Sequence, residues 1–406
     1  MIKNSFFYVL IFMLIADISR SSVLSSQYIE IGLGVLFFSM LIISGKKIPS
    51  KIYLFIGVVF LVNLFALVFL GNEFNLIRLA KLSFILIVLP YAAIVSIGYS
   101  FWYRFEKVVF LLTLLSLPIF VFNALYSDFF NSLIIYFRHT TAQVFYEFSP
   151  NSNYWSAIIY VNSLNEGLLF RNYGFMWEPG AFAMIIIWAL VFNGLSNGIK
   201  FDLRFIIYSI ALFTTFSTAG YFAYFFILSA KYVRTVSIKN IFLFTITIII
   251  FVYFIYQLDF MAGKVTIYQE NFSANLQGED INSNALKVNR FQIFIYDIKD
   301  TLKYPFGHGF NYDTEIIGVN GLSTLLKMWG IPIFIYLMVL LRRYFNLYNA
   351  AQNNTRVILL FFVSISIMFF SNPVDRSIFF YLLIFTPFTF YTHNTKNQNK
   401  TIRKTR

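Results

Sequence analysis

The sequence contains no cysteine, only three histidines among 406 residues, and few charged residues, at 12%. Without cysteine, disulfide bonds and thiolate metal sites are excluded. The histidines, His139, His308 and His393, are too scattered to predict a zinc cluster. A soluble domain carries about 25% charged residues, whereas this chain is 59% hydrophobic and 21% aromatic, with a mean hydropathy of +0.71. We therefore predict a membrane protein that uses neither a metal ion nor a cofactor.

Repeated apolar runs of about 18–20 residues predict transmembrane helices. The expected fold class is all-α, a polytopic membrane protein with about 12 transmembrane helices in a single integral membrane domain, 1–406. Spans are expected near 5–18, 28–43, 52–70, 77–96, 108–125, 180–195, 204–217, 219–230, 241–258, 321–341, 357–371 and 377–391. The seventh and eighth spans are short, and we expect them to form a hairpin that turns at 217–220.

The net charge of +13 would suggest a nucleic-acid partner in a soluble protein. Here a topological explanation is better, because Lys and Arg collect in the cytoplasmic loops of membrane proteins. With the N-terminus inside, most of the 31 basic residues fall in inside segments, among them a basic tail at about 393–406. The short outside loops hold only Arg20 and Arg376. We therefore predict that both termini are cytoplasmic, that the partner is the lipid bilayer, and that no nucleic acid is bound.

This orientation places two long loops outside the cytoplasm, at about 126–179 and 259–320. The first loop carries apolar and aromatic patches, which predict that it lies on the membrane surface or dips into it: Phe129, Phe130, Leu133, Ile134, Ile135, Tyr136 and Phe137. In the second loop, apolar residues recur at helical spacing: Phe291, Phe294, Ile295, Ile298 and Leu302. Charged residues stand between them: Arg290, Asp297, Lys299 and Asp300. This pattern predicts an amphipathic helix along the outer interface.

Arg171 and Glu178 stand seven residues apart, where the first loop enters an apolar span. A guanidinium matches phosphate oxygens in a bidentate way, so Arg171 is a candidate to hold a phosphate or diphosphate. Glu178 precedes Pro179, a typical first helical residue, so the helix N-terminus would point its N–H groups at the same place. The alternative is that Glu178 only caps the helix and Arg171 reaches to lipid headgroups. Tyr173 and Trp177 suit sugar faces, although such aromatic residues are also common interfacial anchors.

Four further polar residues are candidates. Arg290 opens the amphipathic segment, and we expect it to bind phosphate as Arg171 does. His308, in the turn at 305–309, is a candidate general base or hydrogen-bond donor to a leaving group, or is only a polar turn residue. Arg78 and Lys81 lie one helical turn apart on one face. They either bind the diphosphate of a lipid carrier or reach to outer headgroups.

The order of these features resembles the Wzy-type O-antigen polymerases, which share a superfamily with the O-antigen ligases. The matching pieces are Arg171…Gly174…Glu178-Pro179-Gly180, then 216–220, Arg290…305–309, and the stretch 320–330 that begins at Asn320. The ligases show His, then Asn or a similar residue, then nine residues and Gly. Asn320 and Gly330 keep that spacing, but position 319 is Val. The missing histidine favours a polymerase.

The resemblance implies a glycosyl transfer at the outer face of the bacterial inner membrane, without a metal or cofactor. Both substrates would be undecaprenyl-diphosphate-linked oligosaccharides, and the growing chain would move onto a newly flipped unit. Arg171, Arg290 and also Arg78 would stabilise the leaving diphosphate, and Glu178 or His308 would deprotonate the attacking hydroxyl. The resemblance also implies substrate binding by Asn320, Tyr173 and Trp177. A chain-length regulator and a flippase follow as partners from the resemblance alone.

Three other functions stay open at this point. An O-antigen ligase would use the same donor but lipid A core as acceptor. A lipid-linked oligosaccharide flippase would have a similar number of spans, but such transporters tend to show internal repeats and short loops. A scaffold for assembly proteins would have no use for the stretch from Arg171 to Gly180. A nucleotide-driven pump is not expected, because the phosphate-loop and dinucleotide motifs are absent from the sequence.

Overall fold

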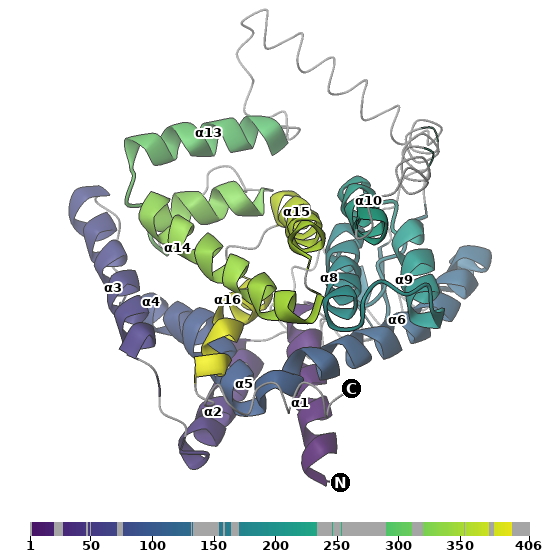
Figure 1. Cartoon of the computed structure of the whole chain (residues 1–406), viewed down its shortest axis with the longest axis horizontal. Coiled ribbons are helices and arrows are strands. Elements are labelled where there is room, and N and C mark those ends of the chain that lie inside the picture. The colour runs from purple at the N-terminus through teal and green to yellow at the C-terminus, as the bar shows by residue number, and fades with distance from the viewer. Residues whose placement is uncertain are drawn as a thin grey trace, which may run out of the picture.

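A computed structural model describes residues 2–19, 27–45, 48, 50–70, 76–130, 132, 154–156, 159–163, 170–233, 246, 253, 290–310, 320–352, 354–372 and 377–391. These residues are predominantly helical (Figure 1). The helices are α1 Ile2–Ile18, α2 Gln27–Ile43, α3 Ser50–Leu70, α4 Leu76–Ser83, α5 Leu89–Ile97, α6 Phe101–Leu125, α8 Pro179–Asn197, α9 Leu203–Thr214, α10 Thr218–Val233, α13 Arg290–Lys303, α14 Gly321–Gln352, α15 Thr355–Ser371 and α16 Ile378–Tyr391. A π-helical turn, Phe84–Val88, joins α4 to α5, and a 3-10 turn, Gly98–Ser100, joins α5 to α6.

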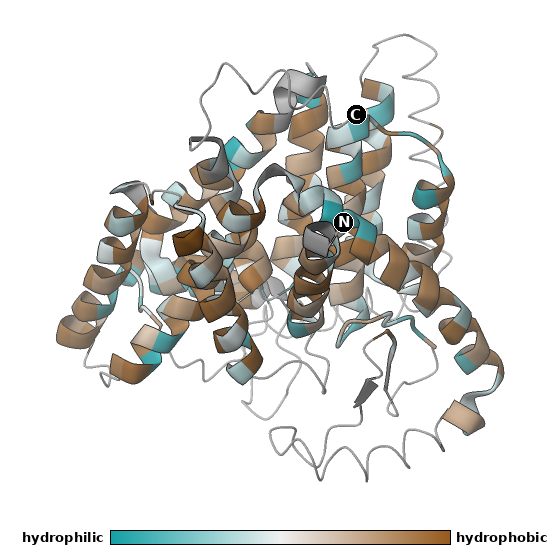
Figure 2. Cartoon of the chain, turned by 90° about the horizontal axis from the view of Figure 1, so that it is seen from below, coloured by the Kyte–Doolittle hydropathy of each residue, from teal (hydrophilic) through white to brown (hydrophobic). Residues whose placement is uncertain are grey.

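Eleven of the twelve expected spans coincide with helices, and the twelfth, 241–258, lies outside the described residues apart from two isolated positions. In the described part of the chain, five segments are long and apolar enough to cross a membrane: Ile52–Leu70, Leu76–Ile97, Phe101–Leu125, Pro179–Asn197 and Gly321–Leu347. Several other apolar helices are shorter. These helices indicate an integral membrane protein, and Figure 2 shows that hydrophobic residues dominate most of them.

Two details of the expected fold are wrong. The seventh span was expected over 204–217, but α9 ends at Thr214, and its 12 residues reach only about 18 Å, short of a hydrocarbon core of about 30 Å. The turn of the hairpin therefore lies at 215–217, and Gly220 belongs to α10. In addition, the first long loop contains a small antiparallel sheet of β1 Tyr154–Ser156 and β2 Val161–Ser163, which the all-α prediction did not include.

Helix α8 occupies the centre of the molecule. It packs against α6, α9, α10, α14 and α15, which surround it in Figure 1, and side chains on all of its faces are buried. A helix that is hydrophobic all round is expected in such a position. Close approach is possible because Gly220 of α10 has no side chain: a Cβ there would lie 2.9 Å from the Cβ of Ala183.

Four aromatic rings from four helices meet beside α8. Trp188 of α8 lies 5.7 Å from Trp102 of α6, 5.6 Å from Tyr344 of α14 and 5.3 Å from Phe379 of α16, measured between ring centroids. The Trp102 indole also donates a hydrogen bond of 2.8 Å to Thr386 of α16. The Trp188–Phe379 pair is edge-to-face, with 85° between the ring planes, and such a pair adds about 0.5–1.5 kcal/mol beyond area burial. The cluster joins α6, α14 and α16 to α8.

Basic residues gather at one end of the helices, and we call this end the basic end. Arg204 at the start of α9 forms an ion pair of 3.0 Å with Glu106 near the start of α6, and Tyr208 donates to the Glu106 carbonyl. The ammonium of Lys231, in the last turn of α10, lies 3.3 Å from the Phe201 ring centroid. The start of α6, the start of α9 and the end of α10 therefore lie together.

Helix α14 is broken in its middle. Gly330 has φ +71°, and Pro332 removes a backbone donor just beyond it. The carbonyls released by this break accept hydrogen bonds from the turn that follows α13: the N–H of His308 donates to Lys327, that of Gly309 to Met328, and the N–H of Ile331 donates to Pro305. The turn is also held by Asn63 of α3, whose Oδ1 accepts 2.8 Å from Phe310. We call residues 305–310 the docked turn.

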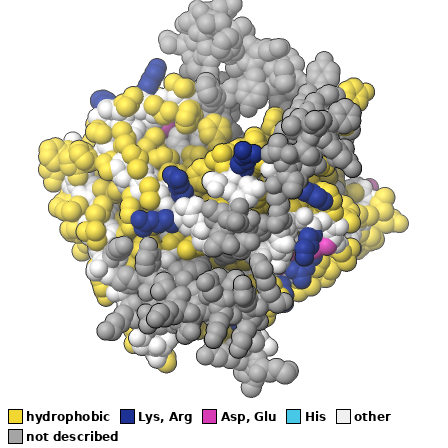
Figure 3. Space-filling model, viewed as in Figure 1, with side chains coloured by type: hydrophobic (Ala, Val, Ile, Leu, Met, Phe, Trp, Pro, Cys, Tyr) yellow, Lys and Arg dark blue, Asp and Glu magenta, His cyan; other side chains and the backbone are white. Residues whose placement is uncertain are grey.

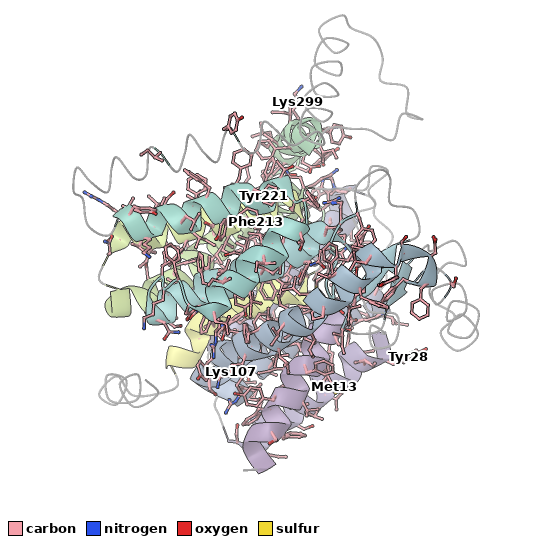
Figure 4. The ribbon with its side chains drawn as sticks, turned by 90° about the vertical axis from the view of Figure 1, so that its right-hand side faces the viewer. Met13, Tyr28, Lys107, Phe213, Tyr221 and Lys299 are labelled. Atoms are coloured by element: carbon pink, nitrogen blue, oxygen red, sulfur yellow. The ribbon has the colours of Figure 1, made fainter. Side chains whose placement is uncertain are left out.

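The predicted amphipathic helix is α13, and the face that it buries against α14 is not its apolar stripe. The buried positions are Ile293, Asp297 and Thr301, and they face α14, whereas Ile295 and Leu302 of the predicted apolar stripe are exposed. The polar partners on α14 explain the difference, as described below. Figure 4 shows α13 end-on above α9 and α10, with Lys299 pointing away from the molecule.

Candidate functional site

The stretch from Arg171 to Glu178 folds as a compact loop against the turn between α9 and α10. Asn172 is fully buried, and its backbone N–H and its Nδ2 donate to the carbonyl and hydroxyl of Thr214, at 2.9 and 2.8 Å. Its Oδ1 accepts 2.8 Å from the N–H of Gly174. Gly174 has φ +52°, and a Cβ there would lie 2.3 Å from the Phe182 ring, so this position requires glycine.

Arg171 is half-buried and binds the α9–α10 turn. Its Nε donates 3.1 Å to the Thr215 carbonyl and its Nη2 donates 3.3 Å to the Phe216 carbonyl. Carbonyls at a helix C-terminus lack intrahelical partners, so this guanidinium caps α9. It also holds Phe216, which has φ +48° and is the one non-glycine residue with positive φ in the part of the chain described. Arg171 thus has a structural role that the sequence did not reveal, and its expected phosphate-binding role stays a prediction.

Glu178 is the N-cap residue of α8. Its backbone is extended, at φ −150° and ψ 153°, and its side chain makes no capping hydrogen bond to the helix. The alternative interpretation, in which Glu178 only caps the helix, is therefore not supported by a side-chain contact. The carboxylate is half-buried and lies beside Gly180: Oε1 is 3.7 Å from the point where a Cβ of Gly180 would stand.

The two expected sugar-binding aromatics differ in exposure. Trp177 is half-buried, whereas Tyr173 is buried, with 8% of its surface exposed, and the sugar-binding role expected of both stays a prediction. The burial of Tyr173 follows from the fold of the loop, in which the Tyr173 carbonyl accepts from the N–H of Met176 and the chain turns inward.

A second polar cluster joins α13 to α14, and we call it the α13–α14 network. Asp297 accepts 2.6 Å from the Ser323 hydroxyl, and the ammonium of Lys327 lies 3.9 Å from Asp297 and 3.3 Å from Asp300. Burial raises the pKa of Asp297, and the Ser323 hydrogen bond and the Lys327 charge oppose this shift. Charged groups in such surroundings are costly unless they are paired, which explains why α13 turns its acidic side toward α14.

His308 faces α13, and its expected role as a general base or hydrogen-bond donor stays a prediction. Its Nε2 lies 2.8 Å from Oδ2 of Asp300, and its ring packs edge-on against Tyr304, with centroids 5.0 Å apart. Burial lowers the pKa of His308, while the Asp300 carboxylate opposes the shift. The His308 imidazole is therefore favoured in its neutral form, as a general base requires.

The other predicted site residues are placed as follows. Arg290 begins α13, as expected, but its side chain lies outside the described residues. Asn320 is fully buried and caps α14, since its Oδ1 accepts 3.2 Å from the Ser323 N–H. Arg78 and Lys81 are half-buried in α4, which lies apart from α8 in Figure 1. The structure therefore does not group Arg78 and Lys81 with the loop around Arg171.

The loop before α8 and the α13–α14 network lie at the same end of the molecule. Two contacts with the C-terminal end of α15 establish this: Asn372 Oδ1 stands 3.2 Å from the Cβ position of Gly180, and the Phe370 ring lies 5.5 Å from the Phe294 ring of α13. Since α9 begins at the basic end and finishes at Arg171, the two polar groups lie at the opposite end from the basic one.

Sequence reasoning missed Asn372, Ser323 and Lys327 as members of this region. Lys327 carried a signal, because a charged residue inside an apolar span usually faces other protein groups. Asn372 carried none, since its position beside Gly180 depends on how α15 packs against α8. Within the described residues, no group of three or more acidic or histidine side chains is arranged to hold a metal ion.

Comparison with known proteins adds no family assignment. No protein-family model matches the chain, and no curated protein sequence matches it. The apolar helices indicate an integral membrane protein.

Proposed function

We propose that this protein polymerises undecaprenyl-diphosphate-linked oligosaccharide repeat units into a surface polysaccharide, at the outer face of the bacterial inner membrane. The observation that carries the proposal is the gathering of the loop from Arg171 to Glu178 and the α13–α14 network at the end opposite the basic one. On the face of the molecule that Figure 1 also shows, Lys and Arg side chains are scattered and acidic ones are few (Figure 3). If basic residues mark the cytoplasmic side, the polar loops lie outside, where flipped lipid-linked units arrive.

The chemistry fits the residues. A sugar on a diphosphate already carries a good leaving group, so the enzyme must mainly stabilise the departing charge. Arg171 is fixed by its bonds to the α9–α10 turn, and an arginine has five N–H donors, so it offers a rigid positive charge beside the loop. Arg290 would add a second charge from the start of α13. Glu178 or His308 would accept the proton of the attacking hydroxyl.

The test is complementation of a strain that lacks the gene. Wild type is expected to restore a ladder of long surface polysaccharide, and Arg171→Ala and Arg290→Ala are expected to abolish the long chains while the protein still inserts in the membrane. Arg342→Ala is the matched control, because Arg342 is exposed in the C-terminal half of α14, and it should give the wild-type ladder. Wild-type ladders in both site variants would refute the assignment.

The same strain separates the rival functions. Loss of a polymerase leaves single repeat units attached to lipid A core, whereas loss of a ligase leaves none attached. Accumulation of lipid-linked units in the cytoplasmic leaflet would instead indicate a flippase. Reporter fusions test the orientation: the proposal requires residues 126–179 and 259–320 outside the cytoplasm, and cytoplasmic signals from both would end it.

A further inference from the structure

The outward side of α13 is both apolar and basic. Ile295 and Leu302 are 38% and 68% exposed, and Lys299 and Lys303 are exposed beside them. Each of the other three lies three or four residues from Lys299, so all four share one side of the helix. The two acidic residues of α13 instead face α14. The side that α13 turns away from α14 therefore exposes positive charge between apolar side chains.

This apolar surface continues from α13 onto α3. Phe306, which follows α13 in the docked turn, is exposed, and its ring centroid lies 5.2 Å from that of Phe65 of α3. The Phe65 ring in turn stacks on Phe69, with centroids 4.4 Å apart. The C-terminal half of α3 belongs to a segment that is apolar enough to cross a membrane, and it exposes further apolar side chains: Leu61, Leu64 and Val68. Contiguous exposed apolar surface of this kind marks contact with lipid.

The direction of α13 suits the membrane surface. Figure 4 shows α13 end-on, whereas α9 and α10 run across the view, and Figure 1 shows α3 and α13 at the edge of the molecule. If α9 and α10 run across the bilayer, α13 lies parallel to its surface. A helix in this position keeps its lysine ammonium groups at the level of the lipid phosphates, while its apolar side chains reach the acyl chains.

The spacing of the two lysines selects the ligand. Side chains four residues apart on a helix have Cβ atoms about 5–6 Å apart, so Lys299 and Lys303 can each bind one phosphate of the same diphosphate. A phospholipid with one phosphodiester needs one ammonium group, and inorganic diphosphate makes no use of the apolar surface beside them. The chemistry points to a diphosphate that carries a long apolar chain.

We infer that the outward side of α13 and the adjoining half of α3, together called the α3–α13 surface, dock the polyprenyl diphosphate of an incoming lipid-linked unit. Lys299 and Lys303 bind the diphosphate, and the polyprenyl chain lies along Phe306 and α3. This inference rests on the proposed function, in which both substrates carry a diphosphate and one of the two stays intact. Exposed, flexible lysines suit the intact diphosphate, since stabilisation of a departing one requires fixed groups.

The decisive variant replaces Lys299 and Lys303 by glutamine. Both side chains are exposed, so the variant should insert and melt as wild type does. In phosphatidylcholine nanodiscs, the Kd of the purified protein for undecaprenyl diphosphate should rise about 30-fold, about fivefold for each lysine. In elongation of the lipid-linked repeat unit, extracted from cells that lack the gene, KM should rise while kcat stays the same. The control replaces Arg342 and Arg343, both exposed in α14, by glutamine; it removes the same charge and should bind as wild type does.

Leu302→Gln tests the apolar part of the surface. It keeps both lysines, and the affinity for undecaprenyl diphosphate should still fall about threefold or more. A tenfold excess of phosphatidylglycerol should leave undecaprenyl diphosphate bound to wild type, and its complete displacement would mean that α13 binds ordinary lipid only.

The outcomes separate this inference from the proposed function. If wild type elongates the repeat unit and the lysine variant binds and elongates equally well, the α3–α13 surface is refuted and the proposed function stands. If wild type itself does not elongate the repeat unit, the proposed function fails, and the docking inference fails with it.

Discussion

Replacement of Gly307 by alanine should undo the docked turn. Gly307 has φ +80°, and a Cβ there would lie 2.4 Å from the Gly330 nitrogen and 2.6 Å from the Met328 oxygen, both of them backbone atoms that cannot rotate away. The left-handed backbone alone costs an L-residue about 1–2 kcal/mol. Moving the turn also breaks three backbone hydrogen bonds of 2.8 to 3.0 Å, each worth about 1 kcal/mol. We expect Gly307→Ala to lower the free energy of unfolding by about 4–5 kcal/mol.

Gly98→Ala is the matched control, because Gly98 has nearly the same φ, +76°, but a Cβ there meets nothing within 4 Å. It should show a backbone cost alone, about 1–3 kcal/mol, because Gly98 combines this φ with ψ −152°. Both variants are compared with wild type by denaturant unfolding in detergent micelles. Equal losses of stability in the two variants would show that the contact between the docked turn and the break in α14 contributes nothing.

Two further predictions concern the α13–α14 network. Ser323→Ala removes the hydroxyl that donates a 2.6 Å hydrogen bond to the buried Asp297, and it should lower the free energy of unfolding by about 1–3 kcal/mol. The control, Ser132→Ala, changes an exposed position and should leave the stability unchanged. Equal unfolding curves for the two variants would contradict this prediction. Burial lowers the pKa of His308 below 6.5, so the unfolded state binds more protons at this residue than the folded state does. The neutral imidazole therefore contributes to the stability of the folded protein above about pH 6.5, and this contribution is lost as the pH falls through the folded-state pKa. The melting temperature of His308→Gln should therefore fall less than that of wild type between about pH 7.5 and pH 5, and parallel curves would count against it.

The sequence predicted where the helices lie along the chain, but not which helices pack against one another. Apolar runs predicted the positions of eleven spans that the structure shows as helical, because a membrane requires long hydrophobic segments whatever their neighbours are. The sequence could not predict that α8 lies at the centre, because a helix that faces lipid and a helix that faces other helices both require an apolar surface. The sequence analysis predicted an unbroken span over 321–341, so neither the break at Gly330 and Pro332 nor the docked turn that fills it was expected.

For the candidate site as well, the sequence identified unusual residues but not their contacts. The sequence singled out Arg171, Glu178 and His308 as unusual polar residues, and the structure places all three at one end of the molecule. What Arg171 and His308 contact, however, depends on long-range packing. The carbonyls of 215–216 and the carboxylate of Asp300 become partners only after α9, α10 and α13 have taken their places.

The burial of α8 has a consequence for how the protein is made. Residues 179–197 leave the ribosome well before those of α14 and α15, which later cover two of their sides. Until then, those sides of α8 face acyl chains, and the helix must be stable in lipid by itself. Its all-round apolar surface thus serves two successive surroundings, and a polar residue suited to the finished protein would be rejected at the moment of insertion.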